Sequence, residues 1–181
     1  RTERLGVPVT GNHLGVRVAA TQDGFVVSGA RAVPELMRFA AYVQTLDADG
    51  ELTAEAYEPA AEMDIGQTNV AVTTQGELTY FAYDREDAVE TQVYVGAVGE
   101  SPRLAVEGLV SSSGADLHAT ATTVWGAMAA ETATGVDIAV LDLVGAHSFS
   151  IGELGRAEHS PHLASDGDAV ALAFYRQIRG F

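Results

Sequence analysis

The sequence of 181 residues contains neither cysteine nor lysine. The absence of cysteine excludes disulfide bonds and metal sites built on thiolates. The ten basic residues are all arginines spread singly along the chain, and with 25 acidic residues they give a net charge of −15. A chain with this charge and no basic patch repels phosphate groups. We therefore expect no binding to nucleic acid, and none to an anionic membrane surface.

Long apolar runs and large apolar side chains are scarce as well. No run approaches the ~18 residues of a membrane span, which predicts no direct membrane insertion. Residues 1–5 show no apolar signal-peptide core. The hydrophobic fraction of 47% rests on 30 Ala and 21 Val, against 4 Ile and 1 Trp. The core must therefore consist of many small contacts rather than a few aromatic anchors.

The acidic excess indicates a salty environment. Self-repulsion of this size is tolerated where salt screens it, because the Debye length falls to about 3 Å at 1 M. Acid-rich sequences without Lys, and with much Ala, Val, Thr and Gly, are typical of halophiles. A genome of high GC content also replaces Lys by Arg, but it does not explain the excess of acids. We favour the halophilic interpretation.

Short segments with alternating apolar and polar residues fill the chain, separated by turn signals. The clearest strand covers 88–98, where Val93 and Val95 share one face and Tyr94 lies on the other. The apolar stretch 136–144 predicts a central strand buried on both faces. Further strands are expected at 14–19, 25–28, 68–74, 77–83, 104–110, 117–125 and 169–178.

Two segments allow alternatives. Pro34 could open a helix through Val43, or residues 38–46 could be a strand that forms a hairpin with 52–57; the alternation of 52–56 favours the hairpin. Residues 126–135 could hold a short helical turn. We find no repeat and no linker, so we expect one domain over residues 1–181. The predicted fold class is all-β, an antiparallel β-sandwich or single jelly roll of roughly 8–10 strands.

A metal site is conceivable before the last strand. Two histidines, His159 and His162, lie three residues apart, with carboxylates nearby at Glu158, Asp166 and Asp168. A polar loop broken by proline and glycine explains the same pattern more simply, because no second ligand-rich segment accompanies it. We therefore predict no bound metal and no cofactor.

A protease triad can also be assembled on paper, from His13 beside Asn12, Asp137, and Ser148 or Ser150. A triad needs all three groups in place, and the Gly-Asp-Ser-Gly motif of the nucleophile is missing. The sequence therefore predicts no enzyme and assigns no catalytic residue.

Two further groups have a simple interpretation. The stretch 47–64 carries seven acidic residues without a basic one, and a solvated acidic face explains it better than a calcium loop, because the EF-hand pattern is absent. Its acidic residues are Asp47, Asp49, Glu51, Glu55, Glu58, Glu62 and Asp64. The aromatic residues could form a sugar-stacking platform, but the core is the better interpretation. They are Trp125, Tyr80, Phe81, Tyr83 and Tyr94.

A family resemblance extends over the whole chain. Its length, its acidic composition without Lys, its succession of strands and its final segment 168–176 resemble the single jelly-roll major capsid proteins, the smaller of two, of tailless internal-membrane icosahedral viruses of halophilic archaea. The resemblance implies a structural virion protein located in the capsid, which associates with itself and with a second, larger capsid protein. It implies no active site and no small-molecule substrate. The alternative is a secreted or surface β-sandwich that binds a carbohydrate or acts as an adhesin.

Overall fold

The computed structural model describes residues 13–59, 65–87, 89–153, 156–167 and 169–177, and these residues form β-strands almost throughout. One short 3₁₀ helix, η1, covers Pro34–Leu36. The strands are β1 His13–Ala20, β2 Gly24–Val33, β3 Arg38–Asp47, β4 Gly66–Gln75, β5 Leu78–Glu86, β6 Thr91–Ala97, β7 Arg103–Leu104, β8 Ser111–Ala119, β9 Val124–Thr132, β10 Gly135–Asp142, β11 His147–Ile151, β12 Ala157–Ser165 and β13 Val170–Gln177. Within the described ranges, no helix has the length and apolar character needed to cross a membrane.

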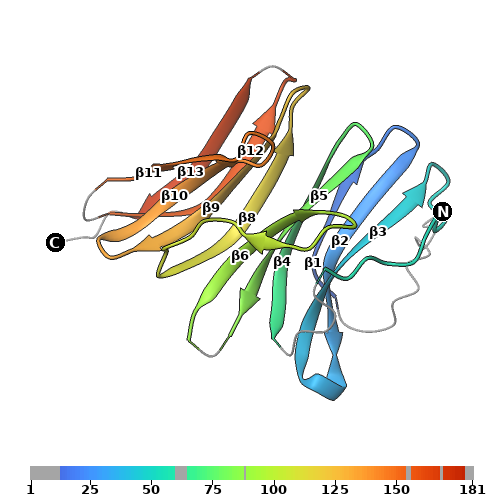
Figure 1. The fold of residues 1–181 in the computed structure, drawn as a ribbon, viewed down its shortest axis with the longest axis horizontal. Coiled ribbons are helices and arrows are strands. Elements are labelled where there is room, and N and C mark those ends of the chain that lie inside the picture. The colour runs from blue at the N-terminus through green and yellow to red at the C-terminus, as the bar shows by residue number, and fades with distance from the viewer. Residues whose placement is uncertain (1–12, 60–64, 88, 154–155, 168, 178–181) are drawn as a thin grey trace.

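Consecutive strands pair as antiparallel hairpins and form four units. Unit 1 contains β1–β3, unit 2 β4–β7, unit 3 β8–β11 and unit 4 the hairpin β12–β13. A single parallel bridge, between Val136 and Ala157, joins β12 to β10 of unit 3. Figure 1 shows the units side by side, from blue unit 1 to red unit 4. The first strand of each unit contacts the first strand of the next, so β1, β4, β8 and β12 follow one another.

Three apolar layers hold the units together. Val70 and Phe81 pack against unit 1, Ala71 and Ala82 pack toward unit 3, and Leu163 belongs to the layer between units 3 and 4. Successive side chains of a strand point to opposite faces, so a strand between two units is apolar on both sides. We call the face toward the preceding unit the upstream face, and the face toward the following unit the downstream face.

Each first strand carries a β-bulge at the same position. The register shifts between Leu14 and Arg17 in β1, and the same three-against-two shift recurs in the other units. The residue after the start of each bulge has a positive φ; these residues are Gly15, Asn69, Gly114 and Ser160. The four units are therefore repeats of one backbone pattern.

The predicted all-β, antiparallel fold class is confirmed, and the face-to-face packing of sheets agrees with a sandwich. The number of strands differs, since the described residues contain thirteen rather than 8–10. A jelly roll is built from Greek keys, in which strands return beside distant neighbours, whereas these strands pair almost entirely in chain order. The sequence shows no repeat, whereas the structure contains one, because the repeat lies in backbone register rather than in residue identity.

Some of the predictions for single segments are confirmed and others are wrong. The hairpin of 38–46 with 52–57 is confirmed by β3 and by the bridges from Val43 to Tyr57 and from Leu46 to Leu52. The segment 136–144 is confirmed as the strand β10 between β9 and β11. The helical turn at 126–135 is wrong, because β9 runs to residue 132. The strand predicted for 117–125 is divided by a turn. In this turn, the Thr120 hydroxyl accepts hydrogen bonds from the backbone amides of Thr122 and Thr123.

Candidate functional site

Three polar side chains from different units meet beside the first strands. The Arg17 guanidinium of β1 lies 3.4 Å from Asp116 Oδ1 of β8. His162 Nδ1 of β12 lies 3.8 Å from Asp116 Oδ2. Asp116 is mostly covered, with 14% of its side chain exposed, whereas Arg17 and His162 are 44% and 65% exposed. The cluster thus has an anchored carboxylate and two groups that reach solvent.

The repeated bulge explains why these residues meet. Arg17, Asp116 and His162 follow the positive-φ residue by two positions in their strands, and all three pair with the equivalent residue of the second strand. Unit 2 has Ala71 at this position and adds no polar group. The sequence shows no repeat, so the residue pattern did not identify Arg17 or Asp116 as site residues. The only indication of their position in the sequence is a glycine two residues earlier, Gly15 or Gly114, at which the bulge forms.

Polar groups next to the bulges also fasten each unit to the following one. Ser28 donates to the Val70 carbonyl at 3.2 Å, the amide of Gly114 donates to Asp84 at 3.0 Å, and the amide of Leu163 donates to Asp116 at 2.8 Å. Asp84 is 1% exposed. Burial raises its pKa to about 6, although the bonds from Asn69 and Gly114 counteract the rise. Because it accepts the Leu163 amide of the following unit, Asp116 has a structural role in addition to its place in the cluster.

The chemistry of the cluster suits recognition of a polar molecule. The carboxylate accepts hydrogen bonds, the guanidinium donates them, and an imidazole can do either. Among the described residues, which include the cluster, no three or more His, Cys, Asp or Glu side chains are grouped so that they could hold a metal ion.

The segment considered for a metal site is strand β12 rather than a loop. The bulge lies between its two histidines: the His159 ring packs against Tyr175 at 5.5 Å, while His162 faces Asp116. Pro161 lies within the bulge, where a missing backbone donor is tolerated. Glu158 is completely buried and receives a 2.5 Å bond from Arg176. Asp166 accepts the Ala169 amide at 3.0 Å, and Asp168 lies outside the described residues.

The histidine of the protease triad considered from the sequence lies in a different unit from the aspartate and the serines. His13 lies in unit 1, where its ring meets the edge of Tyr42, and Asn12 lies outside the described residues. Asp137, Ser148 and Ser150 lie in unit 3.

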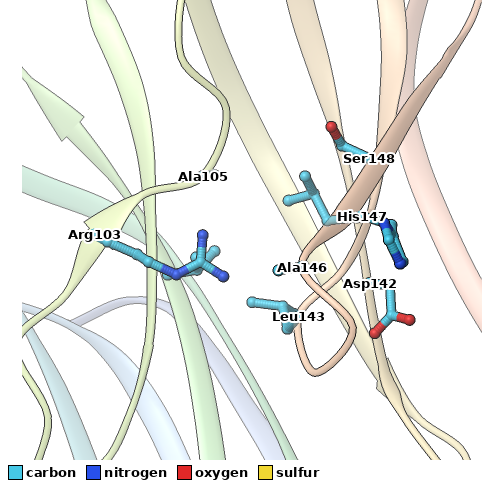
Figure 2. A pocket seen from close by; sticks show the side chains of 9 residues that line it. Arg103, Ala105, Asp142, Leu143, Ala146, His147 and Ser148 are labelled. Atoms are coloured by element: carbon cyan, nitrogen blue, oxygen red, sulfur yellow. The ribbon is translucent and has the colours of Figure 1, made fainter.

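A small cleft between units 2 and 3 holds a different histidine and acid. Figure 2 shows His147 beside Asp142, while Ser148 points away from them. Burial opposes ionisation of Asp142, but bonds from Gly145, Thr123 and Val144 outweigh it and keep its pKa below the usual value. The cleft encloses only about 60 Å³, far less than the ~300 Å³ of a small substrate pocket. It is therefore a packing gap.

The acidic stretch and the aromatic residues have structural roles where they are described. The Asp47 carboxylate accepts the amides of Asp49 and Glu51, as a turn does, and Glu58 pairs with Arg31. Glu55 is exposed, and Glu62 and Asp64 lie outside the described residues.

The aromatic residues lie in the core or pack against it. Phe81 and Tyr83 are fully buried in the apolar layer toward unit 1, and Tyr94 stacks on Tyr83. Tyr80 packs on the layer toward unit 3, and Trp125 is half-buried.

Larger hollows lie elsewhere, and two of them are grooves between neighbouring units. A groove of about 540 Å³ runs between the turns of units 1 and 2 and is lined by Thr45, Asp47 and Glu77 among others. An apolar groove of about 360 Å³ lies between units 3 and 4, beside Trp125 and Phe149. The residues that line the first groove include acids but no basic side chain, and those that line the second groove are all apolar or aromatic.

No family model matches the chain, and no curated protein matches it. Among solved structures, the chain is similar to a subtype N10 neuraminidase-like protein of A/little yellow-shouldered bat/Guatemala/060/2010, with a TM-score of 0.59 and 6% sequence identity. The similarity covers 88% of this chain and 50% of that chain, so this chain spans about half the length of the protein it matches. That protein has a β-propeller-like fold, and at this identity the likeness concerns the fold alone.

Proposed function

We propose that this chain is a non-catalytic binding module whose ligand site is the cluster of Arg17, Asp116 and His162. One observation carries the proposal: the same bulged position of three first strands supplies all three side chains, so the repeat itself gathers them. The cluster lies where units converge, which is a usual place for ligand sites in multi-unit folds.

The ligand class that fits this cluster is a small hydroxyl-rich molecule, such as a saccharide. Neighbouring hydroxyl groups both donate and accept, and so they can bond to the carboxylate of Asp116 and the guanidinium of Arg17 together. This proposal agrees with the carbohydrate-binding alternative from the sequence.

Glycan arrays followed by calorimetric titration at molar salt test this function. We expect saccharide binding that Arg17→Ala and Asp116→Asn each weaken at least tenfold, since each removes a charged hydrogen-bonding group. Asn at position 116 keeps an oxygen for the Leu163 amide. Arg103→Ala, at another exposed arginine in β7, serves as the control. Binding that is unchanged in Arg17→Ala, or release of a hydrolysed sugar, would contradict the proposal.

A second candidate is the shell subunit that the sequence predicts, located in a virion capsid and associated with copies of itself and a larger capsid protein. The row of exposed apolar side chains on β1 favours self-association: Leu14, Val16 and Val18 are 44%, 58% and 66% exposed. Light scattering and electron microscopy at molar salt test it, alone and with virion components. Large particles support a shell, whereas a small discrete oligomer or a monomer counts against it.

A further inference from the structure

The upstream end of the stack is uncovered although its counterparts inside the molecule are buried. The register aligns Val16 and Val18 of β1 with Val70 and Val72 of β4. Val70 and Val72 are 0% and 7% exposed because unit 1 covers them, whereas Val16 and Val18 are 58% and 66% exposed. No described unit precedes β1 to cover this strip.

The downstream end is uncovered in the same way. The register aligns Ala173 and Tyr175 of β13 with Ala82 and Asp84 of β5. Ala82 and Asp84 are 0% and 1% exposed beneath unit 3. Tyr175 is 57% exposed, and the small residues around it are exposed as well; they are Ala164, Ala171 and Ala173.

The two ends are complementary because they are the two halves of the same contact. Inside the molecule, alanines on a downstream face pack against branched side chains on the next upstream face, as Ala30 and Ala41 do against Val70 and Val72. A downstream face with Ala173 and an upstream strip with Val16 and Val18 fit this pattern.

The polar positions are complementary too. Asp116 accepts the amide of the next first strand inside the molecule, and His162 has the equivalent position in unit 4. The amide equivalent to that of Leu163 is the amide of Val18. An imidazole nitrogen can accept it as a carboxylate does.

We propose that two copies of this chain associate head to tail, with unit 4 of each copy packed on unit 1 of the other, and so close a ring. The contact continues the unit-to-unit packing that the molecule already uses. The likeness to a β-propeller-like fold supports two copies, because this chain aligns with 50% of that chain and two copies therefore match its length approximately. A closed ring also leaves no uncovered terminal face. The proposal does not depend on the saccharide site.

Sedimentation or light scattering at molar salt measures the state directly. Salt is needed because each copy carries a charge of −15, which repels its partner when unscreened. We expect twice the chain mass of 18.9 kDa. Val18→Asp should give a folded monomer, because the side chain is exposed within one copy but buried in the ring. Val89→Asp is the matched control and should stay dimeric, since Val89 is 92% exposed outside both end faces.

Cross-linking tests the head-to-tail orientation. The chain has no cysteine, so single variants Val18→Cys and Ala173→Cys each carry one thiol. A short bis-maleimide should link the two variants when they are mixed, and neither variant alone. Ala173→Arg should dissociate the dimer as Val18→Asp does, with an unchanged circular dichroism spectrum. A monomeric wild type, a dimeric Val18→Asp, or linkage between identical positions would overturn the proposal.

Discussion

At the scale of one residue, Asp84 joins two units by hydrogen bonds although burial disfavours its ionised form. Its carboxylate lies between units 2 and 3 and accepts bonds from Asn69 at 2.7 Å and from the Gly114 amide, and the like charge of Glu86 adds to the rise of its pKa. The bonds fasten the units, but burial disfavours the ionised form and raises the pKa to about 6. The group therefore favours the folded state most when it is protonated.

The pH dependence follows from that sign. The folded pKa lies above the ordinary value of 3.8, so the stabilisation is complete below pH ~4 and is lost as the pH rises through about 6. Relative to Asp84→Asn, the wild type should gain on the order of 2–3 kcal/mol of unfolding free energy between pH 7 and pH 4. Denaturant unfolding across this range measures it, with Asp23→Asn in an exposed turn as the control. A difference that does not change with pH would contradict the assignment.

Glu158 is the second buried carboxylate that depends on a specific partner. It is 0% exposed, one oxygen accepts the Arg176 Nε at 2.5 Å, and the other oxygen has no partner. We expect Arg176→Met to lower the unfolding free energy by about 3 kcal/mol, because it leaves a buried charge unpaired. The double variant Glu158→Leu/Arg176→Met should recover most of this loss.

Arg156→Met provides the control for that pair. Arg156 bonds Glu153 at 3.3 Å, with both side chains well exposed, and such pairs contribute at most about 0.5–1 kcal/mol. Urea titrations give all three values. Equal losses in Arg176→Met and Arg156→Met would show that burial of Glu158 does not matter energetically.

At the scale of the element, the bulge is the feature that makes each unit a copy of the others. It needs one residue in the left-handed region, which costs a residue with a Cβ about 1 kcal/mol or more. Glycine fills this position in β1 and β8, while Asn69 and Ser160 fill it in β4 and β12. Different residue types thus support the same backbone, which hides the repeat from sequence comparison.

Gly114→Ala isolates this backbone cost. An added Cβ would meet nothing within 4 Å, so only the φ of +66° opposes the substitution. We expect a loss of about 1 kcal/mol in unfolding free energy. Gly66→Ala is the control: its Cβ would make ordinary contacts at 3.7 and 3.8 Å with Glu86, and we expect no loss. Similar effects at both positions would show that the bulge conformation is not strained for alanine.

At the scale of the whole molecule, the net charge of −15 should govern stability more than any single contact. Unscreened repulsion opposes the compact state, and molar salt shortens its range to about 3 Å. We expect the midpoint of thermal unfolding to fall when salt is reduced from molar to millimolar concentration. Calorimetry across a salt series, using the Val18→Asp monomer beside the wild type, separates charge within a chain from dissociation. An unchanged or higher midpoint in low salt would favour genome composition as the reason for the missing Lys.

The sequence by itself determined the period-2 alternation, the acidic surface and the small-residue core, and from these it predicted an all-β antiparallel fold. It also identified β10 and the β3 hairpin, because alternation and turn residues act over neighbouring positions. It could not separate β8 from β9, since an Ala- and Thr-rich turn closed by Thr120 looks like a continuous strand. The loop predicted around His159 became a strand because a bulge accommodates Pro161.

Only the tertiary structure decided how the strands group into four units and which side chains meet. Arg17, Asp116 and His162 lie far apart in the chain, and their contact depends on equal register in β1, β8 and β12. Register is set by cross-strand pairing and by packing between sheets, which involve residues distant in sequence. The capsid prediction rested on composition and strand content, which many all-β architectures share. The stacking of units depends on contacts that composition does not encode.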